Sequence, residues 1–154
     1  MFLWLESTPV AQWVALSLWA YPLLLAVHIV GLAIVVGIFA IRDMRLLGLF
    51  PALQPAAFLP LSKLAWVGFI INAISGIMLF TSQAVTFVNS AAFLIKIGSI
   101  VAGMVLAGVI QSRLRGELSG DGTIRLSGST RGIAAASLAL WVTAIIAGRL
   151  IAYL

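Results

Sequence analysis

The chain has 154 residues, enough for one domain. Hydrophobic residues make up 63% of it and charged residues only 8%, whereas a soluble globular domain has about 25% charged residues. This composition excludes a soluble domain and makes the lipid bilayer the solvent. The net charge of +5 therefore indicates basic loops beside a membrane rather than binding of nucleic acid.

The N-terminal segment predicts a short helix that lies on the membrane surface or leads into it. Thr8 can cap a helix and Pro9 suits its first turn, so we expect residues 9–20 to be helical. No Lys or Arg precedes the first apolar run, which argues against a cleavable signal peptide. Tryptophan suits the headgroup region, and the segment contains Trp4, Trp13 and Trp19.

Four later stretches approach the roughly 20 apolar residues that a helix needs to cross the bilayer core. The sequence therefore predicts an all-α polytopic membrane protein, a four-transmembrane-helix bundle with an N-terminal interfacial helix. Residues 1–154 form a single integral membrane domain. The predicted spans are residues 21–41, 64–82, 91–112 and 132–153.

The connections between these spans differ in charge. The second connection, residues 83–90, has no charged residue, whereas the first and third contain seven Lys and Arg residues. Basic loops stay on the cytoplasmic side, so we expect both termini to face the periplasm of a bacterial inner membrane. The seven basic residues are Arg42, Arg45, Lys63, Arg113, Arg115, Arg125 and Arg131.

Three basic residues fall inside the predicted spans, where an ionisable group is costly and needs a partner or a function. At 1.5 Å per helical residue, His28 lies about 10 Å deep, Lys96 about 7 Å and Arg149 about 6 Å, all in the outer half. No carboxylate falls within the predicted spans. We therefore expect one pocket that accepts an anion. Polar or soft groups at similar depth are Ser75, Met78 and Gln83, while Asn72 lies deeper.

Each of these residues also has a purely structural interpretation. Lys96 and Arg149 can extend to the outer headgroups. His28 can be a packing residue that is hydrogen-bonded to a neighbouring helix. Methionines such as Met78 more often fill space than bind metal. Three basic groups at one depth, with no acid to meet them, favour the functional interpretation.

Heme b and a quinone both suit such a pocket. Imidazole ligates heme iron and cations bind the two propionates, while His and Lys can hydrogen-bond quinone carbonyls. Copper(I) prefers clusters of Cys, Met and His, and the chain has no cysteine and one histidine. His28 is the candidate metal ligand.

Several segments resemble a bacterial family of four-helix inner-membrane proteins that has no assigned function, and the likeness covers nearly the whole chain. Many members of that family have a further His where this chain has Asn89, and a Pro at Ala91, which puts a two-histidine site within one chain in doubt. The segments are WLESTPVAQW, HIVGLAIVVGIFAIRDMRLLGL, SGIMLF, AFLIK and AGRLIAYL.

Two other families are more distantly similar. One is the copper-resistance protein D-like membrane family. The other is the small heme-binding membrane protoporphyrinogen oxidase, in which a first-helix His and a later Lys are functional. AVHIVG and AFLIKIG resemble those two positions, so the resemblance assigns the roles to His28 and Lys96.

These observations predict a membrane redox protein that binds heme b or a quinone and acts in electron transfer. His28 would be the axial ligand or a hydrogen-bond donor, and Lys96 and Arg149 would hold the propionates or the quinone head. Met78, neutral Lys96 or a second protomer's His28 are candidates for the sixth iron ligand. The alternative is a non-redox protein, either a small transporter of copper or another solute, or a structural subunit of a larger membrane complex. We expect a homo-oligomer or membership of such a complex.

Overall fold

The computed structural model describes residues 2–118 and 128–153, with the side chains of residues 117 and 118 left out. All regular structure in this part of the chain is helical. In chain order the elements are α1 (Leu3–Glu6), α2 (Pro9–Leu16), α3 (Ala20–Leu46), the short 3-10 helix η1 (Pro55–Ala57), α4 (Phe58–Ser82), α5 (Ala84–Val88), α6 (Ala91–Leu118) and α7 (Gly128–Leu150).

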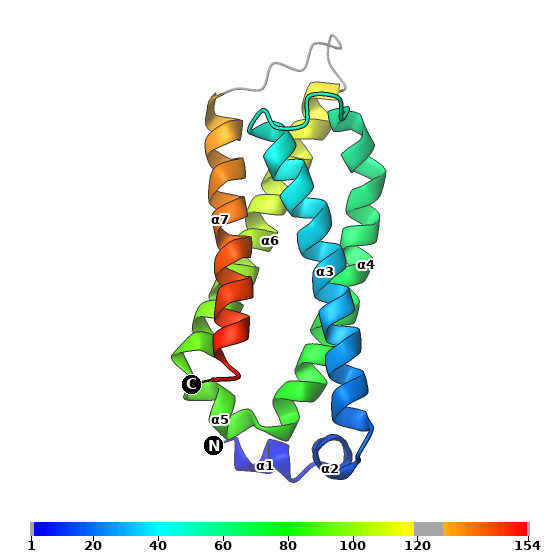
Figure 1. Ribbon diagram of the computed structural model, residues 1–154, viewed down its shortest axis with the longest axis vertical. Coiled ribbons are helices and arrows are strands. Elements are labelled where there is room, and N and C mark those ends of the chain that lie inside the picture. Colours follow the sequence, from blue (N-terminus) through cyan, green and yellow to red (C-terminus); the bar gives the residue numbers. More distant parts are fainter. Residues whose placement is uncertain (1, 119–127, 154) are drawn as a thin grey trace.

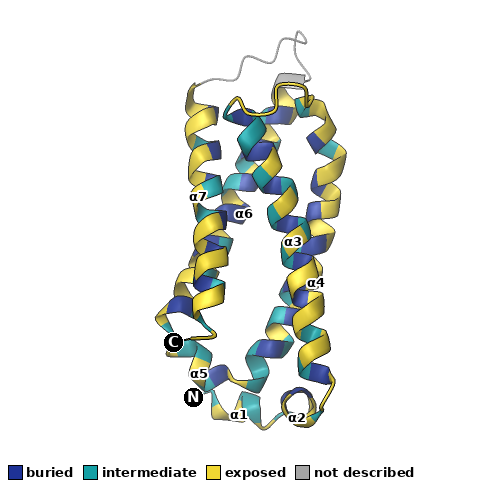
Figure 2. Ribbon diagram, viewed as in Figure 1, coloured by how far each residue is buried: buried dark blue, intermediate teal, exposed yellow. Residues whose placement is uncertain are grey.

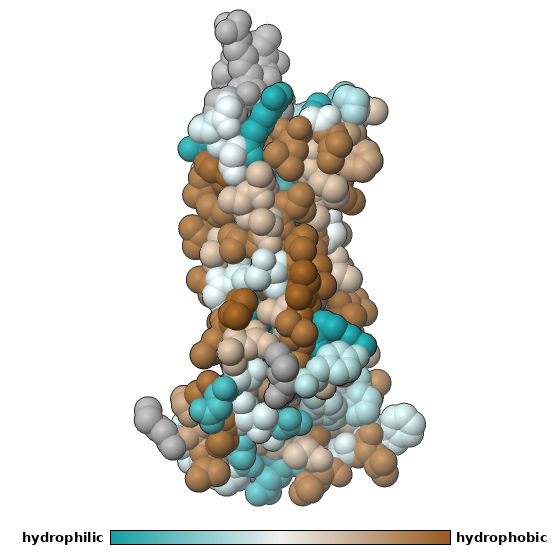
Figure 3. All heavy atoms as spheres, turned by 60° about the vertical axis from the view of Figure 1, so that its left-hand side comes forward, coloured by the Kyte–Doolittle hydropathy of each residue, from teal (hydrophilic) through white to brown (hydrophobic). Residues whose placement is uncertain are grey.

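Helices α3, α4, α6 and α7 are each long and apolar enough to cross a membrane, which confirms the predicted four-helix membrane bundle (Figure 1). Their outward faces consist mainly of exposed apolar side chains, and residues buried inside the bundle lie on the faces between helices (Figure 2). Hydrophobic residues dominate the middle of the face shown in Figure 3, and hydrophilic ones gather toward its ends. A surface of this kind matches the lipid that surrounds it.

The bundle is built from two helix pairs. Helix α3 packs mainly on α4, α6 packs mainly on α7, and the contact between α3 and α7 joins the pairs (Figure 1). Glycines allow the first pair to approach closely, since a Cβ at Gly31 would lie 2.9 Å from the backbone of both Gly68 and Asn72. Small residues at such seams are typical of membrane helices, because close van der Waals packing replaces the hydrophobic effect there.

The main core lies where the two pairs meet. Phe39 of α3 stacks on Trp141 of α7 with their ring centroids 5.7 Å apart. Other members of this cluster are Val35, Ala65, Met104 and Ala107. A second cluster lies nearer the end that holds the α3–η1 connection and contains Leu46, Ile110, Leu114 and Ala134. Both clusters lie away from the end of the bundle where the chain begins and ends.

Helices α1 and α2 lie across the end of the bundle at which both termini are found, and α2 runs across the long axis (Figure 1). The predicted helix start is confirmed: Pro9 is the first residue of α2, and the Thr8 hydroxyl accepts a hydrogen bond from the amide of Ala11 at 3.3 Å. Helix α2 ends at Leu16, earlier than predicted, because Ser17 has an extended backbone. The Glu6 carboxylate accepts a hydrogen bond from the amide of Val85 at 2.9 Å and ties α1 to α5.

The first predicted span ends too early. Helix α3 continues to Leu46, so Arg42 and Asp43 belong to the helix and not to the connection that follows it. The prediction that no carboxylate lies within a span is therefore wrong, since the Asp43 side chain is fully buried in the bundle. The largest other differences are at α4, which begins at Phe58 instead of residue 64, and at α6, which ends at Leu118 instead of residue 112. Residues 119–127 of the third connection lie outside the described part.

Candidate functional site

His28 lies on the inner face of α3, toward the end of the bundle that holds the termini. Its position follows from helical spacing, because the buried residues of this face recur every three or four positions: His28, Gly31, Val35 and Phe39. The imidazole faces α4, and only 9% of the residue is exposed. A buried imidazole needs hydrogen-bond partners, and α4 supplies them.

His28 and Asn72 hydrogen-bond to each other, and Ser75 lies beside the same nitrogen of the imidazole. Its Nδ1 atom lies 3.0 Å from the backbone oxygen of Asn72 and 3.2 Å from the hydroxyl of Ser75. In return, the Asn72 side-chain amide donates to the backbone oxygen of His28 at 2.8 Å. A carbonyl oxygen can only accept, so Nδ1 carries the proton and donates it. The other ring nitrogen, Nε2, is left with its lone pair.

Gly76 makes room for the ring. A Cβ at this position would lie 3.0 Å from Cε1 of His28 and 3.3 Å from Nδ1, and would press on the imidazole. Gly76 and Asn72 are four residues apart on α4, on the face that meets α3. The histidine therefore sits in a recess formed by one helix, with hydrogen bonds on one edge of the ring and glycine beside it.

Lys96 approaches the opposite edge of the ring from α6. Its Nζ atom lies 3.5 Å from Nε2 of His28, and its stem passes beside Gly148 of α7. The ammonium group donates, which agrees with a lone pair on Nε2. Among the described residues no carboxylate is found in an ion pair with Lys96, and the Arg42–Asp43 ion pair lies elsewhere. His28 and Lys96 are thus brought together as predicted from their depths.

Arg149 and Met78 are not part of this contact. The Arg149 side chain is exposed, and its guanidinium donates to the Tyr153 hydroxyl at 2.9 Å and stacks over the Tyr153 ring at 5.2 Å. Met78 is half-buried on α4, one turn beyond Ser75. The structure joins two of the three predicted cations, and the part of Arg149 and Met78 in holding a ligand stays a prediction.

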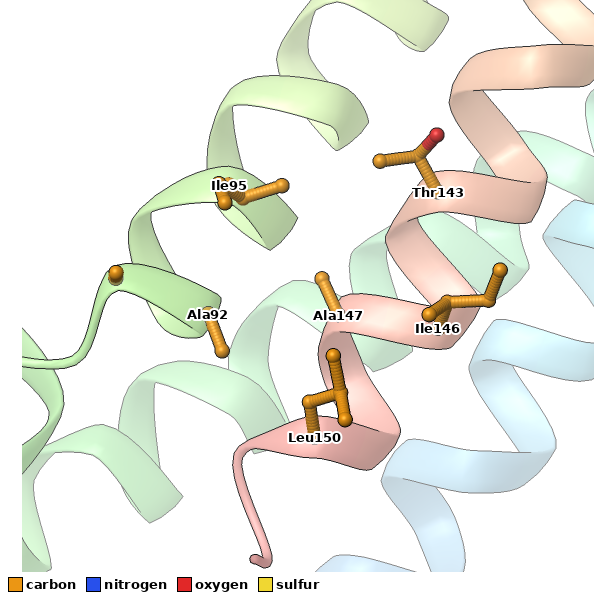
Figure 4. Close-up of a pocket in the computed structure, with 7 residues that line it drawn as sticks. Ala92, Ile95, Thr143, Ile146, Ala147 and Leu150 are labelled. Carbon is orange, nitrogen blue, oxygen red and sulfur yellow. The ribbon is translucent and has the colours of Figure 1, made fainter. Parts of the chain in front are cut away.

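Two pockets lie near this end of the bundle. One, of about 260 Å³, is an apolar groove between α6 and α7, and Figure 4 shows Ala92 and Ile95 facing Ala147 and Leu150 across it. The other, of about 340 Å³, has walls that are as apolar as they are polar and is lined by Ala15, Tyr21, Ser82 and Gln83. His28 lines neither pocket, so neither pocket opens onto the polar contact between His28 and Lys96.

Asn72 and Gly76 are the residues of this site that the sequence did not identify. Asn72 was placed deeper than the cations, and Gly76 was not singled out. Their signal was available in the spacing of Gly68, Asn72, Ser75 and Gly76, which places small and polar residues on one stripe of α4. The sequence could not show that this stripe faces the histidine.

Comparison with protein-family models, curated proteins and solved structures finds no match to this chain. The resemblance of its segments to the families named above therefore stays a prediction, and the site's own residues carry the functional inference.

Proposed function

We propose that this chain is a membrane redox protein that binds heme b, or a quinone, at His28 in the outer half of the bundle. One observation carries the proposal. The Nδ1 proton of His28 is held by the Asn72 carbonyl, and this leaves the Nε2 lone pair beside the Lys96 ammonium group. Histidines that bind metal in proteins are commonly oriented in this way by a carbonyl or carboxylate.

The donor atoms fit one side of a heme. The Nε2 lone pair suits an axial bond to iron, and Lys96 can neutralise a propionate or, when neutral, offer its own lone pair. Bound heme b would supply one-electron chemistry, while the chain holds the imidazole, balances charge and excludes water. The two described pockets do not include His28, so a macrocycle requires either separation of α6 from α3 or a site between two copies.

A quinol is the second candidate, and the orientation of the histidine makes its role specific. With the proton on Nδ1, Nε2 accepts a hydrogen bond and does not donate one. His28 would therefore take the proton of a quinol hydroxyl, while Lys96 would stabilise the oxygen anion that results. The pocket of about 340 Å³ beside Tyr21, Ser82 and Gln83 does not include His28, so a quinol at Nε2, like a heme, requires α6 to separate from α3 or a site between two copies.

The absorption spectrum of the purified protein tests the proposal. We expect a Soret band that is lost in His28→Ala and weakened in Lys96→Ala, and that is unchanged in Lys63→Ala, whose side chain is exposed at the other end. For the quinol candidate, quinone is extracted from the same preparations and quantified. A parent protein without heme or quinone, together with a His28→Ala variant that folds and supports growth unchanged, would mean that His28 is a packing residue.

Non-redox roles are the runner-up: a small transporter of copper or another solute, or an accessory subunit of a larger complex. Among the described residues no group of three or more His, Cys, Asp or Glu residues lies together as a metal site. A copper path through this chain would thus depend on His28 and methionines, or on a second chain. Copper content measured alongside the heme spectrum separates these roles.

We further propose that the protein lies in the bacterial inner membrane with both termini in the periplasm. The basic residues Arg45, Lys63, Arg113 and Arg131 support this orientation, because positively charged loops stay in the cytoplasm. Alkaline phosphatase fused to the C-terminus should be active. A fluorescent protein that matures only in the cytoplasm should stay dark there, and a bright fusion would reverse the topology.

An oligomer or a complex with another membrane protein is also proposed. Gly98 and Gly108 are exposed and have no neighbouring atom within 4 Å of a Cβ at those positions. Outward-facing glycines on membrane helices allow close approach of another helix. Cross-linking in native membranes should yield a dimer or a larger species, whereas monomer alone with no co-purifying partner would oppose this proposal.

A further inference from the structure

A buried ion pair lies in the other half of the bundle, away from His28. The Arg42 side chain is 1% exposed and that of Asp43 is 0% exposed. Arg42 uses two nitrogens on one carboxylate oxygen: its Nε and Nη2 atoms donate to Oδ1 of Asp43 at 2.9 Å and 2.7 Å. Its Nη1 atom donates to the backbone oxygen of Ala107 at 3.3 Å, and its guanidinium lies over the Phe39 ring. The arginine is therefore well satisfied.

The second oxygen of the carboxylate is not satisfied. Three buried atoms make no hydrogen bond of good geometry within the described part of the chain: Oδ2 of Asp43, the hydroxyl of Ser137 and the indole Nε1 of Trp141. Ser137 lies close to the Asp43 carboxylate. Ser137 and Trp141 are four residues apart on α7 and share the face that points into the bundle. Asp43 and Ser137 thus form a polar spot within an apolar core, and Trp141 lies one helical turn from Ser137 on the same face of α7.

Leaving these buried groups without a hydrogen-bond partner is unfavourable. A buried polar group without a partner costs about 1–3 kcal/mol, and an ionised oxygen costs more. More than nine in ten buried polar groups in proteins are paired, with ordered water included among the partners. Unpaired atoms on Asp43, on Ser137 beside it and on Trp141 one helical turn away therefore point to a bound molecule that they share.

We propose that this spot is an internal water site, in which one or two waters bridge Asp43 Oδ2, Ser137 Oγ and Trp141 Nε1. The ligand must donate to a carboxylate oxygen and accept from an indole N–H, and water does both. A metal cation is disfavoured because Arg42 already neutralises the carboxylate and the indole can only donate. An anion is disfavoured by the carboxylate itself. This inference is independent of any cofactor at His28.

The test uses the indole N–H of Trp141 in the full-length protein, labelled with 15N and held in lipid nanodiscs. The other four tryptophans are exposed, so single Trp→Phe variants at Trp4, Trp13, Trp19 and Trp66 assign the Trp141 signal by elimination without touching the core. We expect a rotating-frame Overhauser cross-peak between this proton and water, with the sign of a bound water and not of chemical exchange. A Trp141 indole with cross-peaks to protein protons alone would overturn the proposal.

Ser137→Ala tests the second partner. It removes one of the three groups and should weaken the water cross-peak at least twofold, whereas Thr143→Ala, on the exposed side of the same helix, should leave it unchanged. Equal intensity in the parent and Ser137→Ala would remove Ser137 from the site. A high-resolution crystal structure of the parent in a lipid phase gives an answer that needs no variant. Density within hydrogen-bond distance of Oδ2 supports the site, and a direct Ser137–Asp43 hydrogen bond with no such density excludes it.

Discussion

Helix α3 carries two charged sites, one in each half of the bundle, and they are satisfied in opposite ways. In the half near the termini, Lys96 faces only the neutral nitrogen of His28 at 3.5 Å. In the other half, Arg42 has a carboxylate, a carbonyl and an aromatic ring around it. Helix α3 thus carries one cation that is fully paired, Arg42, and through His28 it meets another, Lys96 of α6, that has no acid beside it among the described residues.

The Arg42–Asp43 pair has a structural explanation, because each charge meets an opposite one. The position of Lys96 beside His28 has no such explanation. Removing a partner from a buried ion pair is expensive because it leaves an uncompensated charge. The contacts of Arg42 therefore account for its presence. A lysine inside a membrane helix, with no acid beside it, lowers stability and is a functional-site candidate for that reason. Stability measurements on variants of each site test this contrast.

The largest expected effect is at the ion pair. Asp43→Asn keeps the shape of the side chain but removes its charge, so Arg42 stays buried without a counter-ion. We expect a loss of about 3–5 kcal/mol in the free energy of unfolding. Thermal or denaturant unfolding in a mild detergent measures it.

Two further variants complete that experiment. Arg131→Gln removes a cation that is exposed on α7 and should change stability by less than about 0.5 kcal/mol. The double variant Arg42→Met with Asp43→Leu should recover much of the loss, because apolar residues can replace a buried pair. An Asp43→Asn protein as stable as its parent would show that the pair is not needed for the fold.

A smaller effect is expected where the helix pair α3–α4 is closest. Gly31→Ala places a methyl group 2.9 Å from backbone atoms of Gly68 and Asn72, so the helices must move apart. Overpacking of this kind costs about 1–3 kcal/mol. The hydrogen bonds that hold His28 to α4 span this same contact, so we also expect weaker binding of any cofactor.

Gly37→Ala is the matched control on the same helix. Nothing lies within 4 Å of a Cβ there, and alanine favours a helix over glycine by up to about 1 kcal/mol. Unfolding curves should place Gly37→Ala at or above the parent and Gly31→Ala below it. The same stability for both variants would mean that the close α3–α4 contact does not form.

The smallest expected change in stability is at Lys96. Lys96→Met keeps the stem of the side chain and removes a charge that has no acid beside it, so the protein should be as stable as its parent or slightly more stable. An upper limit is the cost of about 2.5–3.5 kcal/mol for a lysine at the centre of a membrane helix. Unfolding of the cofactor-free protein is the measurement. A loss of stability as large as that of Asp43→Asn would show that Lys96 is structural, and the contrast between the two halves would disappear.

Much of the fold could be predicted from local patterns. Four apolar runs specify four membrane helices, because a backbone in lipid must satisfy its own hydrogen bonds. The start of α2 followed from two adjacent residues, Thr8 and Pro9. His28 and Lys96 could be selected together because their distances from the ends of their spans agree. Each of these inferences needs only the chain near the residue in question.

The sequence by itself therefore determined the class of the protein and the number of its membrane helices, and it selected three candidate cations, of which the structure brings His28 and Lys96 together. Tertiary structure decided which charges have partners. Arg42 looked like the start of a basic connection, because local hydropathy counts a charge as polar whatever lies beside it. Its burial depends on the Ala107 carbonyl of α6, which is far away in the sequence. Likewise, only the packing of α4 on α3 shows that Asn72 holds the Nδ1 proton of His28, which leaves Nε2 facing Lys96.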